Sequence, residues 1–210
     1  MDELRILHAD EALVAVDKPS GLLSVPGRGP DKADCALARV LRQFADALVV
    51  HRLDMGTSGI LLFARGLAAQ RALSRAFEQR LSEKGYEALV WGLPAEDTGE
   101  VSLPLRCDWP NRPRQMVDPL QGKAALTRWS VLAREPARQR SRLALRPVTG
   151  RSHQLRVHLQ ALGHPILGDE LYAPAPAREA APRLLLHARH LALPHPLTGQ
   201  PFVVESAPPF

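Results

Sequence analysis

The segment of the chain that most clearly suggests chemistry is HRLDMGTSGILLFAR, residues 51–65. It carries one carboxylate, Asp54, just before a turn-forming Gly-Thr-Ser-Gly run, and one arginine, Arg52, two positions earlier. If residues 52–54 continue the strand-like run before them, both side chains point to the same face. A carboxylate there could act as a nucleophile or a base, whereas the simpler alternative is an aspartate that caps the turn.

Three further residues are candidates for binding or chemistry. Tyr86 lies in the strand-like segment KGYEALVWG, and Arg151 and Arg156 flank an expected helix start with Ser152 as its N-cap. A phenol can transfer a proton, and an arginine can pair with a carboxylate or a phosphate. Taken singly, the tyrosine also fits a core position and each arginine a solvated charge.

Other kinds of site find no support in the sequence. His153 and His158 are five residues apart, whereas two zinc ligands on one helical face need a spacing of four. Cys35 and Cys107 form no CxxC pair, so neither a disulfide framework nor a cysteine zinc site is indicated. The chain also lacks GxSxG, Walker and GxGxxG patterns. We therefore expect chemistry without a metal and without a cofactor.

Hydrophobic periodicity predicts the elements that must position these residues. Strand-like segments outnumber helical ones and do not alternate with them regularly, which favours an α+β domain over a doubly wound parallel sheet. The segment RCDWPNRPRQMVD, residues 106–118, is expected to be an exposed loop or ribbon. Strands are expected within residues 4–17, 47–50, 59–64, 84–92, 99–105, 125–133, 141–148, 184–193 and 202–206, and helices within 35–46, 67–81 and 152–162.

Two of these helices have clear apolar stripes. In residues 67–81 the stripe contains Leu73, Phe77 and Leu81. In residues 152–162 it contains Leu155, Leu159 and Leu162, and Gly163 with Pro165 supplies the stop signal.

The overall composition indicates a globular protein, and its charge fits an anionic partner as well as a protein that binds nothing anionic. With 210 residues and 45% hydrophobic content, the chain is long enough for one domain with a substantial core. The net charge of +5 fits a polyanion, and only four of the 27 basic residues are lysines; arginine forks onto phosphates and stacks on bases. No segment has the length of a membrane span or the pattern of a signal peptide, so we expect a cytoplasmic protein.

Several segments, in their order and spacing, resemble the RluA family of pseudouridine synthases. They are DKPSGLLSVPG, HRLDMGTSGILLFA, KGYEALVWG, GRSHQLRVHLQALGHPILGD and LLLHARHLALPHPLTG, and the resemblance runs from about residue 5 to the C-terminus. HRLD followed by TSG is its most specific part. LSVPGR, CDWPNRPRQ and PRLLLHA further resemble the dual-specificity members, which act on large-subunit ribosomal RNA and on the anticodon stem-loop of certain transfer RNAs.

The resemblance implies a mixed, mostly antiparallel sheet with flanking helices and a central RNA-binding cleft. It also implies isomerisation of uridine to pseudouridine without a metal or a cofactor. By motif, Asp54 is similar to the catalytic aspartate, Tyr86 to the active-site tyrosine, and Arg156 to the arginine that pairs with the aspartate. Leu155 would line the pocket, and Arg52 resembles the arginine that enters the RNA stack in place of the flipped uridine.

We expect one catalytic domain, residues 1–210, because no linker is long enough to define a second one, and we expect the protein to act as a monomer. The catalytic pattern begins too early to leave room for the N-terminal S4 RNA-binding domain of many relatives, so we expect none. The expected partners are stem-loops of ribosomal RNA and transfer RNA, and not a membrane. Arg112 and Arg114 in the proline-rich segment, together with Arg151, are expected to hold backbone phosphates.

The implied reaction accounts for a motif with a single acid. Cleavage of the bond between C1′ of ribose and N1 of uracil leaves an electron-poor carbon that a carboxylate can attack or stabilise. Whether Asp54 attacks the sugar or C6 of the base stays open. Uracil leaves as a stabilised anion, so no second acid is needed, and Arg156 would lower the pKa of Asp54 and keep it ionised. Two other functions stay open: a non-catalytic RNA-binding module, and a hydrolase that uses Asp54 with nearby histidines.

Overall fold

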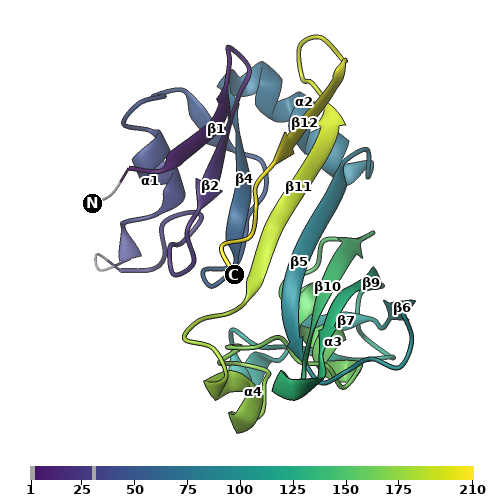
Figure 1. Ribbon diagram of the computed structural model, residues 1–210. Coiled ribbons are helices and arrows are strands. Elements are labelled where there is room, and N and C mark those ends of the chain that lie inside the picture. The colour runs from purple at the N-terminus through teal and green to yellow at the C-terminus, as the bar shows by residue number, and fades with distance from the viewer. Residues whose placement is uncertain (1–2, 30–31) are drawn as a thin grey trace. The chain divides into compact units, whose positions relative to one another are not determined.

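The computed structural model describes residues 3–29 and 32–210. The chain forms two compact units, which we describe in turn (Figure 1). The first unit contains the residues up to Lys84 together with His187–Pro209, and the second contains Gly85–Leu186 and Phe210. The Gly, Pro and Ser residues of segment 18–30 predict an irregular loop. The chain is irregular from Pro19 to Gly29, and Pro30 lies outside the described residues.

The strands of the first unit form a mixed sheet. Its order is β1-β2-β4-β11, with β12 paired to β11 and β3 paired to β4. All of these pairs are antiparallel except β11 with β4, which is parallel. The strands are β1 (Arg5–Ala9), β2 (Leu13–Lys18), β3 (Ala47–Val49), β4 (Ser58–Arg65), β11 (Leu186–Pro194) and β12 (Pro201–Glu205).

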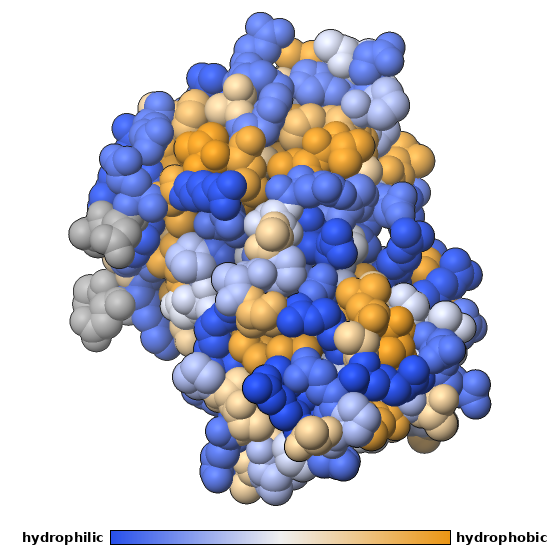
Figure 2. Space-filling view, in the orientation of Figure 1, coloured by the Kyte–Doolittle hydropathy of each residue, from blue (hydrophilic) through white to orange (hydrophobic). Residues whose placement is uncertain are grey.

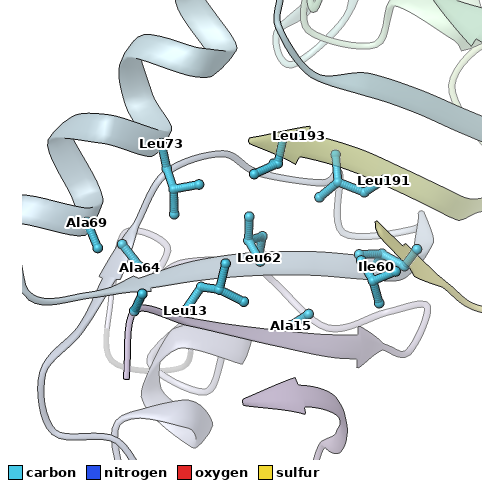
Figure 3. Packing of buried hydrophobic residues seen from close by; sticks show 11 residues of the cluster. Leu13, Ala15, Ile60, Leu62, Ala64, Ala69, Leu73, Leu191 and Leu193 are labelled. Atoms are coloured by element: carbon cyan, nitrogen blue, oxygen red, sulfur yellow. The ribbon is translucent and has the colours of Figure 1, made fainter. Parts of the chain in front are cut away.

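The core of the first unit lies where α2 (Gly66–Glu78) packs on this sheet. Figure 3 shows Ala69 and Leu73 of the helix directed toward leucines of β4 and β11. Burial of each leucine contributes about 1.5–3 kcal/mol. The predicted stripe is wrong at its end: the helix stops at Glu78, so Leu81 no longer follows the helical period and is 54% exposed.

The helix predicted in residues 35–46 is confirmed but shorter. It is α1 (Ala36–Val40), and Cys35 is its N-cap because the Cys35 sulfur accepts a hydrogen bond from the Ala38 N–H at 3.3 Å. Beyond Val40 the chain continues as turns, and Leu41 is exposed.

The second unit has an antiparallel sheet in the order β5-β10-β9-β6. Its strands are β5 (Glu83–Trp91), β6 (Thr98–Ser102), β9 (Leu126–Glu135) and β10 (Arg140–Pro147). Helix α3 (Gln154–Ala161) buries Leu155 and Leu159 against leucines of β10, as its stripe predicts. The helix ends at Ala161 with Leu162 as its C-cap, and Gly163 follows with a φ of 86°, which glycine adopts without strain.

Two smaller features complete the second unit. The exposed loop or ribbon predicted for residues 106–118 is confirmed. It is a two-stranded ribbon of β7 (Leu105–Cys107) and β8 (Gln115–Val117), joined through a 3-10 turn at Trp109–Asn111, and it begins one residue earlier than predicted. The short helix α4 (Ala175–Glu179) lies in a proline- and alanine-rich stretch for which we predicted no element.

The predicted α+β class with a mostly antiparallel sheet is therefore confirmed. Among residues 3–29 and 32–210, no helix combines the length and the apolar character needed to cross a membrane. The face drawn in Figure 2 mixes hydrophilic residues with smaller hydrophobic patches.

Candidate active site

Asp54 lies in the irregular segment between β3 and β4. The prediction that positions 52 and 54 share one face of a strand is wrong, because β3 ends at Val49 and residues 51–54 are not extended in a sheet. Arg52 is exposed and Asp54 is half-buried. The turn that follows is closed through the backbone, since the Asp54 carbonyl accepts a hydrogen bond from the Thr57 N–H at 3.1 Å.

A cradle of three side chains, from the end of β2 and the loop that follows it, holds residues 53–56. Lys18 is fully buried, and its Nζ donates to the carbonyls of Pro19, Leu22 and Met55 at 2.8–3.1 Å. The Ser20 hydroxyl donates to the Gly56 carbonyl at 2.7 Å. The hydroxyl of Ser24 donates to the Leu53 carbonyl at 2.7 Å and accepts from the Leu53 N–H at 3.0 Å. The backbone on both sides of Asp54 is thereby fixed.

Lys18 also sets the electrostatics of this segment. Its burial lowers the Lys18 pKa to about 7, and the negative charge of Asp54 acts in the opposite direction. The Lys18 pKa thus reflects both its burial and the nearby carboxylate of Asp54 within the first unit. Sequence reasoning treated residues 18–30 only as a loop; the signal it missed is a lysine at the end of a buried strand.

His51, which precedes this segment, has a structural role. Its Nε2 accepts a hydrogen bond from the Leu62 N–H at 2.9 Å, and its ring lies 4.9 Å from the Phe77 ring. Burial, together with the smaller effect of the positive charge of Lys84, lowers the His51 pKa to about 4. His51 is therefore neutral at pH 7 with Nε2 occupied, which argues against a hydrolase that uses this histidine as its base.

The Thr-Ser-Gly part of the motif begins β4. Ser58 bonds to His187 of β11 at 2.9 Å. Gly59 has a φ of 108°, and a Cβ at this position would lie 2.2 Å from the Ala188 carbonyl oxygen. Glycine is therefore required where β4 and β11 pair in parallel.

In the second unit, Tyr86 and Leu155 both contact one hydrophobic cluster. Tyr86 lies on β5 opposite Leu145 of β10 and is half-buried. Leu155 is buried among the leucines of the same cluster, so its position is set by core packing.

The guanidinium of Arg156 is buried and held in one orientation. Its Nε and Nη2 donate to the two carboxylate oxygens of Asp169 at 2.9 and 2.6 Å, and it lies 5.0 Å from the centre of the Tyr172 ring. Asp169, itself fully buried, also accepts from the N–H groups of Leu171 and Tyr172. Sequence reasoning missed Asp169 although it ends the segment GRSHQLRVHLQALGHPILGD. The pairing of Arg156 with Asp54 stays a prediction.

The start of α3 differs from the prediction. The N-cap is His153 in a left-handed conformation with a φ of 53°, and not Ser152. The prediction fails because the Gln154 side chain supplies the local bonds: its Oε1 accepts from the Thr149 hydroxyl at 2.7 Å and from the Arg151 N–H at 3.0 Å. His153 Nδ1 lies 2.6 Å from the Tyr172 hydroxyl.

The three arginines predicted to hold phosphates are all exposed. Arg112 stacks on the Trp109 ring at 4.7 Å, and Arg114 lies 5.5 Å from the centre of the Tyr172 ring. Arg151 donates through Nε to the Ala124 carbonyl at 3.1 Å. Within the described parts of the chain, none of the three guanidinium groups has a carboxylate partner, so each can bind an anion.

Comparisons with known proteins agree on one family. Residues 12–161 match the sequence model described as RNA pseudouridylate synthase. The chain is 54% identical over 206 residues to the dual-specificity RNA pseudouridine synthase RluA of Pasteurella multocida, covering 98% of this chain and 93% of that protein. The enzyme of that name from Escherichia coli K12 is 50% identical over 99% of this chain and 94% of its own length. The solved structure of human RNA pseudouridylate synthase domain containing 1 is 32% identical, with a TM-score of 0.83 over 99% of this chain and 84% of the human chain.

Proposed function

Given that this chain belongs to the RNA pseudouridylate synthase family, we propose that it isomerises specific uridines of stem-loop RNA with Asp54 as its catalytic carboxylate. The observation that carries the assignment is the cradle of Lys18, Ser20 and Ser24, which fixes the backbone around one half-buried acid. A surface aspartate that only caps a turn would not need such support from a fully buried lysine.

The proposed roles follow from the chemistry of the reaction. Asp54 acts on C1′ of the ribose or on C6 of the base while the bond between C1′ and N1 breaks. Tyr86 stacks on the freed uracil and relays the proton that leaves C5 in the last step, passing its own phenol proton to solvent water. Uracil departs as a stabilised anion, so these roles need no metal and no cofactor.

Arg156 is proposed to pair with Asp54 during the reaction. The two hydrogen bonds from Arg156 to Asp169 support this role. A guanidinium that is held through Nε and one Nη keeps its other N–H groups in a fixed direction. Leu155, the residue before it, is proposed to present its side chain to the base.

RNA binding is assigned to exposed arginines. A uridine within a loop must leave the stack before its C1′ can be reached, at a cost of a few kcal/mol, and Arg52 is proposed to fill the gap. Arg112, Arg114 and Arg151 are proposed to hold phosphates of the flanking nucleotides.

The finer assignments rest on the similar proteins named above. Because the relatives are called dual-specificity enzymes, we propose that both a stem-loop of 23S ribosomal RNA and the anticodon stem-loop of transfer RNA are substrates. We also propose that the protein acts in the cytoplasm, as a monomer and as a single catalytic domain.

The test is release of tritium from RNA labelled at C5 of uridine, measured without added metal. The native protein is expected to release tritium to water, and Asp54→Asn to release none. Asp46→Asn is the matched control, because it changes another half-exposed acid of the same unit that bonds only to a surface arginine in the described structure. Asp46→Asn is expected to react at the native rate.

The alternatives give different results in the same assay. A non-catalytic RNA-binding module would bind RNA and release no tritium from any RNA tried. A hydrolase would release free uracil in place of forming pseudouridine. Equal rates for the native protein and Asp54→Asn would contradict the role of Asp54.

A further inference from the structure

A groove of about 520 Å³ lies in the second unit between the ribbon β7–β8 and helix α3, outside the residues assigned to catalysis. Asp108, Arg114 and Met116 line it from the ribbon. Val157 and Gln160 line it from α3, where a spacing of three residues places both side chains on one helical face.

The two walls of the groove are joined, so the groove is preformed. Tyr172 lies between them, and its hydroxyl accepts a hydrogen bond from the Gln115 N–H of β8 at 2.7 Å. The same hydroxyl contacts His153 at the start of α3. The ribbon is closed further by the ion pair of Arg106 with Asp118. A preformed site loses little conformational entropy when it binds a ligand.

The groove offers several kinds of contact at once. Arg114 supplies a cation that already lies over the Tyr172 ring, and Asp108 and Gln160 supply hydrogen-bond acceptors, with a donor on the glutamine. Met116 and Val157 supply apolar surface. A phosphate alone would use only the Arg114 cation, whereas a nucleotide can place its phosphate at Arg114 and the apolar face and polar edge of its base against the rest of the groove.

The adjoining surface favours RNA over a peptide as the occupant. Trp109 follows Asp108 in the chain, is 63% exposed and carries the stacked guanidinium of Arg112. Exposed aromatic rings beside arginines are typical of surfaces that bind single-stranded nucleic acid. We propose that the groove binds one unpaired base of the substrate RNA, a nucleotide of the loop other than the isomerised uridine. This inference rests on the proposed function.

The test is a set of stem-loop RNAs in which each loop nucleotide in turn is replaced by an abasic residue. Kd is measured at one salt concentration for the native protein, Met116→Ala and Gln160→Ala. At one loop position, the abasic change is expected to weaken binding to the native protein about tenfold. With either groove variant the same change is expected to weaken binding less than twofold, while the other positions keep their native effects.

Leu132→Ala is the matched control, because Leu132 is a partly exposed apolar residue on β9 of the same unit and does not line the groove. It is expected to keep the full tenfold effect. The inference is overturned if the groove variants also keep that effect, or if they weaken binding equally for every RNA of the set.

The same RNAs are assayed for tritium release, which separates this inference from the proposed function. If the native protein releases tritium while the groove variants lose the abasic effect at no loop position, this result overturns the groove assignment alone. If the groove variants instead lose the abasic effect at one position while no RNA releases tritium, this result overturns the proposed catalysis and leaves the groove assignment supported.

Discussion

A buried guanidinium such as that of Arg156 is stable only when its charge and its N–H groups have partners. Asp169 supplies the charge, and the Tyr172 ring covers part of the guanidinium. Asp169 in turn is held by two backbone N–H groups, so the pair has little freedom to move. Asp169 therefore acts in our account as a positioning residue for Arg156.

Asp169→Asn is expected to lower kcat for pseudouridine formation by about tenfold to a hundredfold while KM changes less than threefold, because a misdirected guanidinium costs reaction rate more than RNA binding. The free energy of unfolding is expected to fall by about 3 kcal/mol, since one partner of a buried ion pair is lost. Steady-state kinetics and urea unfolding measure the two effects.

Glu87→Gln is the matched control for this variant. Glu87 is also buried and pairs with Arg142 in the same unit, and strand alternation directs it away from the face of Tyr86. It is expected to lose stability with kcat within threefold of the native value. An equal loss of kcat in both variants would mean that Asp169 acts only through stability.

The lowered pKa of His51 leads us to expect that the stability of the protein depends on pH. Its pKa is about 4 in the folded protein and 6.5 in the unfolded chain, so the unfolded state binds the proton first as the pH falls. The free energy of unfolding is therefore expected to decrease as the pH is lowered from 6.5 to 4, by at most about 3 kcal/mol. Urea unfolding at several pH values measures the slope.

In His51→Gln, the side-chain amide can still accept the Leu62 N–H but does not titrate. Its unfolding free energy is expected to change less steeply over the same pH range. The slope corresponds to the number of protons taken up on unfolding, and this number is expected to be smaller than in the native protein by up to one. Identical slopes for the two proteins would contradict a neutral, buried imidazole at position 51.

At the scale of elements, the candidate catalytic segment depends on β4 and on the loop before it. β4 is buried along almost its whole length, and it pairs with β2 on one side and β11 on the other. The close approach of β11 at Gly59 leaves no room for a side chain. The TSG part of the motif is thus explained by strand packing, and only the HRLD part by proposed chemistry.

Gly59→Ala tests this explanation. Its Cβ would meet the Ala188 backbone, so we expect a loss of about 3 kcal/mol or more in the free energy of unfolding. Gly199→Ala is the control, because Gly199 also has a positive φ, of 70°, but a Cβ there would meet no atom within 4 Å. It should lose only about 1 kcal/mol from backbone strain. Similar losses in the two variants would contradict the packing argument.

Local sequence patterns predicted most elements because apolar periodicity reports which face of a segment is buried. The stripes of Leu73 and of Leu155 with Leu159 led to α2 and α3. Helix ends were less predictable: α2 stops before Leu81, and α3 starts one residue beyond His153 because Gln154 makes the local bonds.

The candidate residues were found through motif resemblance, and their supports were not found at all. The bond from Lys18 to the Met55 carbonyl joins residues 37 positions apart, and Asp169 lies 13 positions after Arg156. No local period relates such pairs, because they arise from the tertiary fold. The only sign of Lys18 and Asp169 in the sequence is that they are charged residues, and many surface residues are charged as well.

At the scale of the whole molecule, the candidate residues are divided between the two units. The first unit contains Arg52 and Asp54, and the second contains Tyr86, Arg156 and the groove between the ribbon and α3. We propose that these residues and the groove all act on the same RNA in one reaction. The net charge of +5 suits that partner, because RNA presents phosphates around every loop.

The most direct test of the account is the nucleoside content of a uridine-containing stem-loop after incubation with excess protein. Digestion and chromatography of the RNA count pseudouridine against uridine. We predict that the native protein converts one defined uridine nearly completely and that Asp54→Asn, at equal RNA occupancy, converts none. Pseudouridine formed by Asp54→Asn at the native rate would contradict the account.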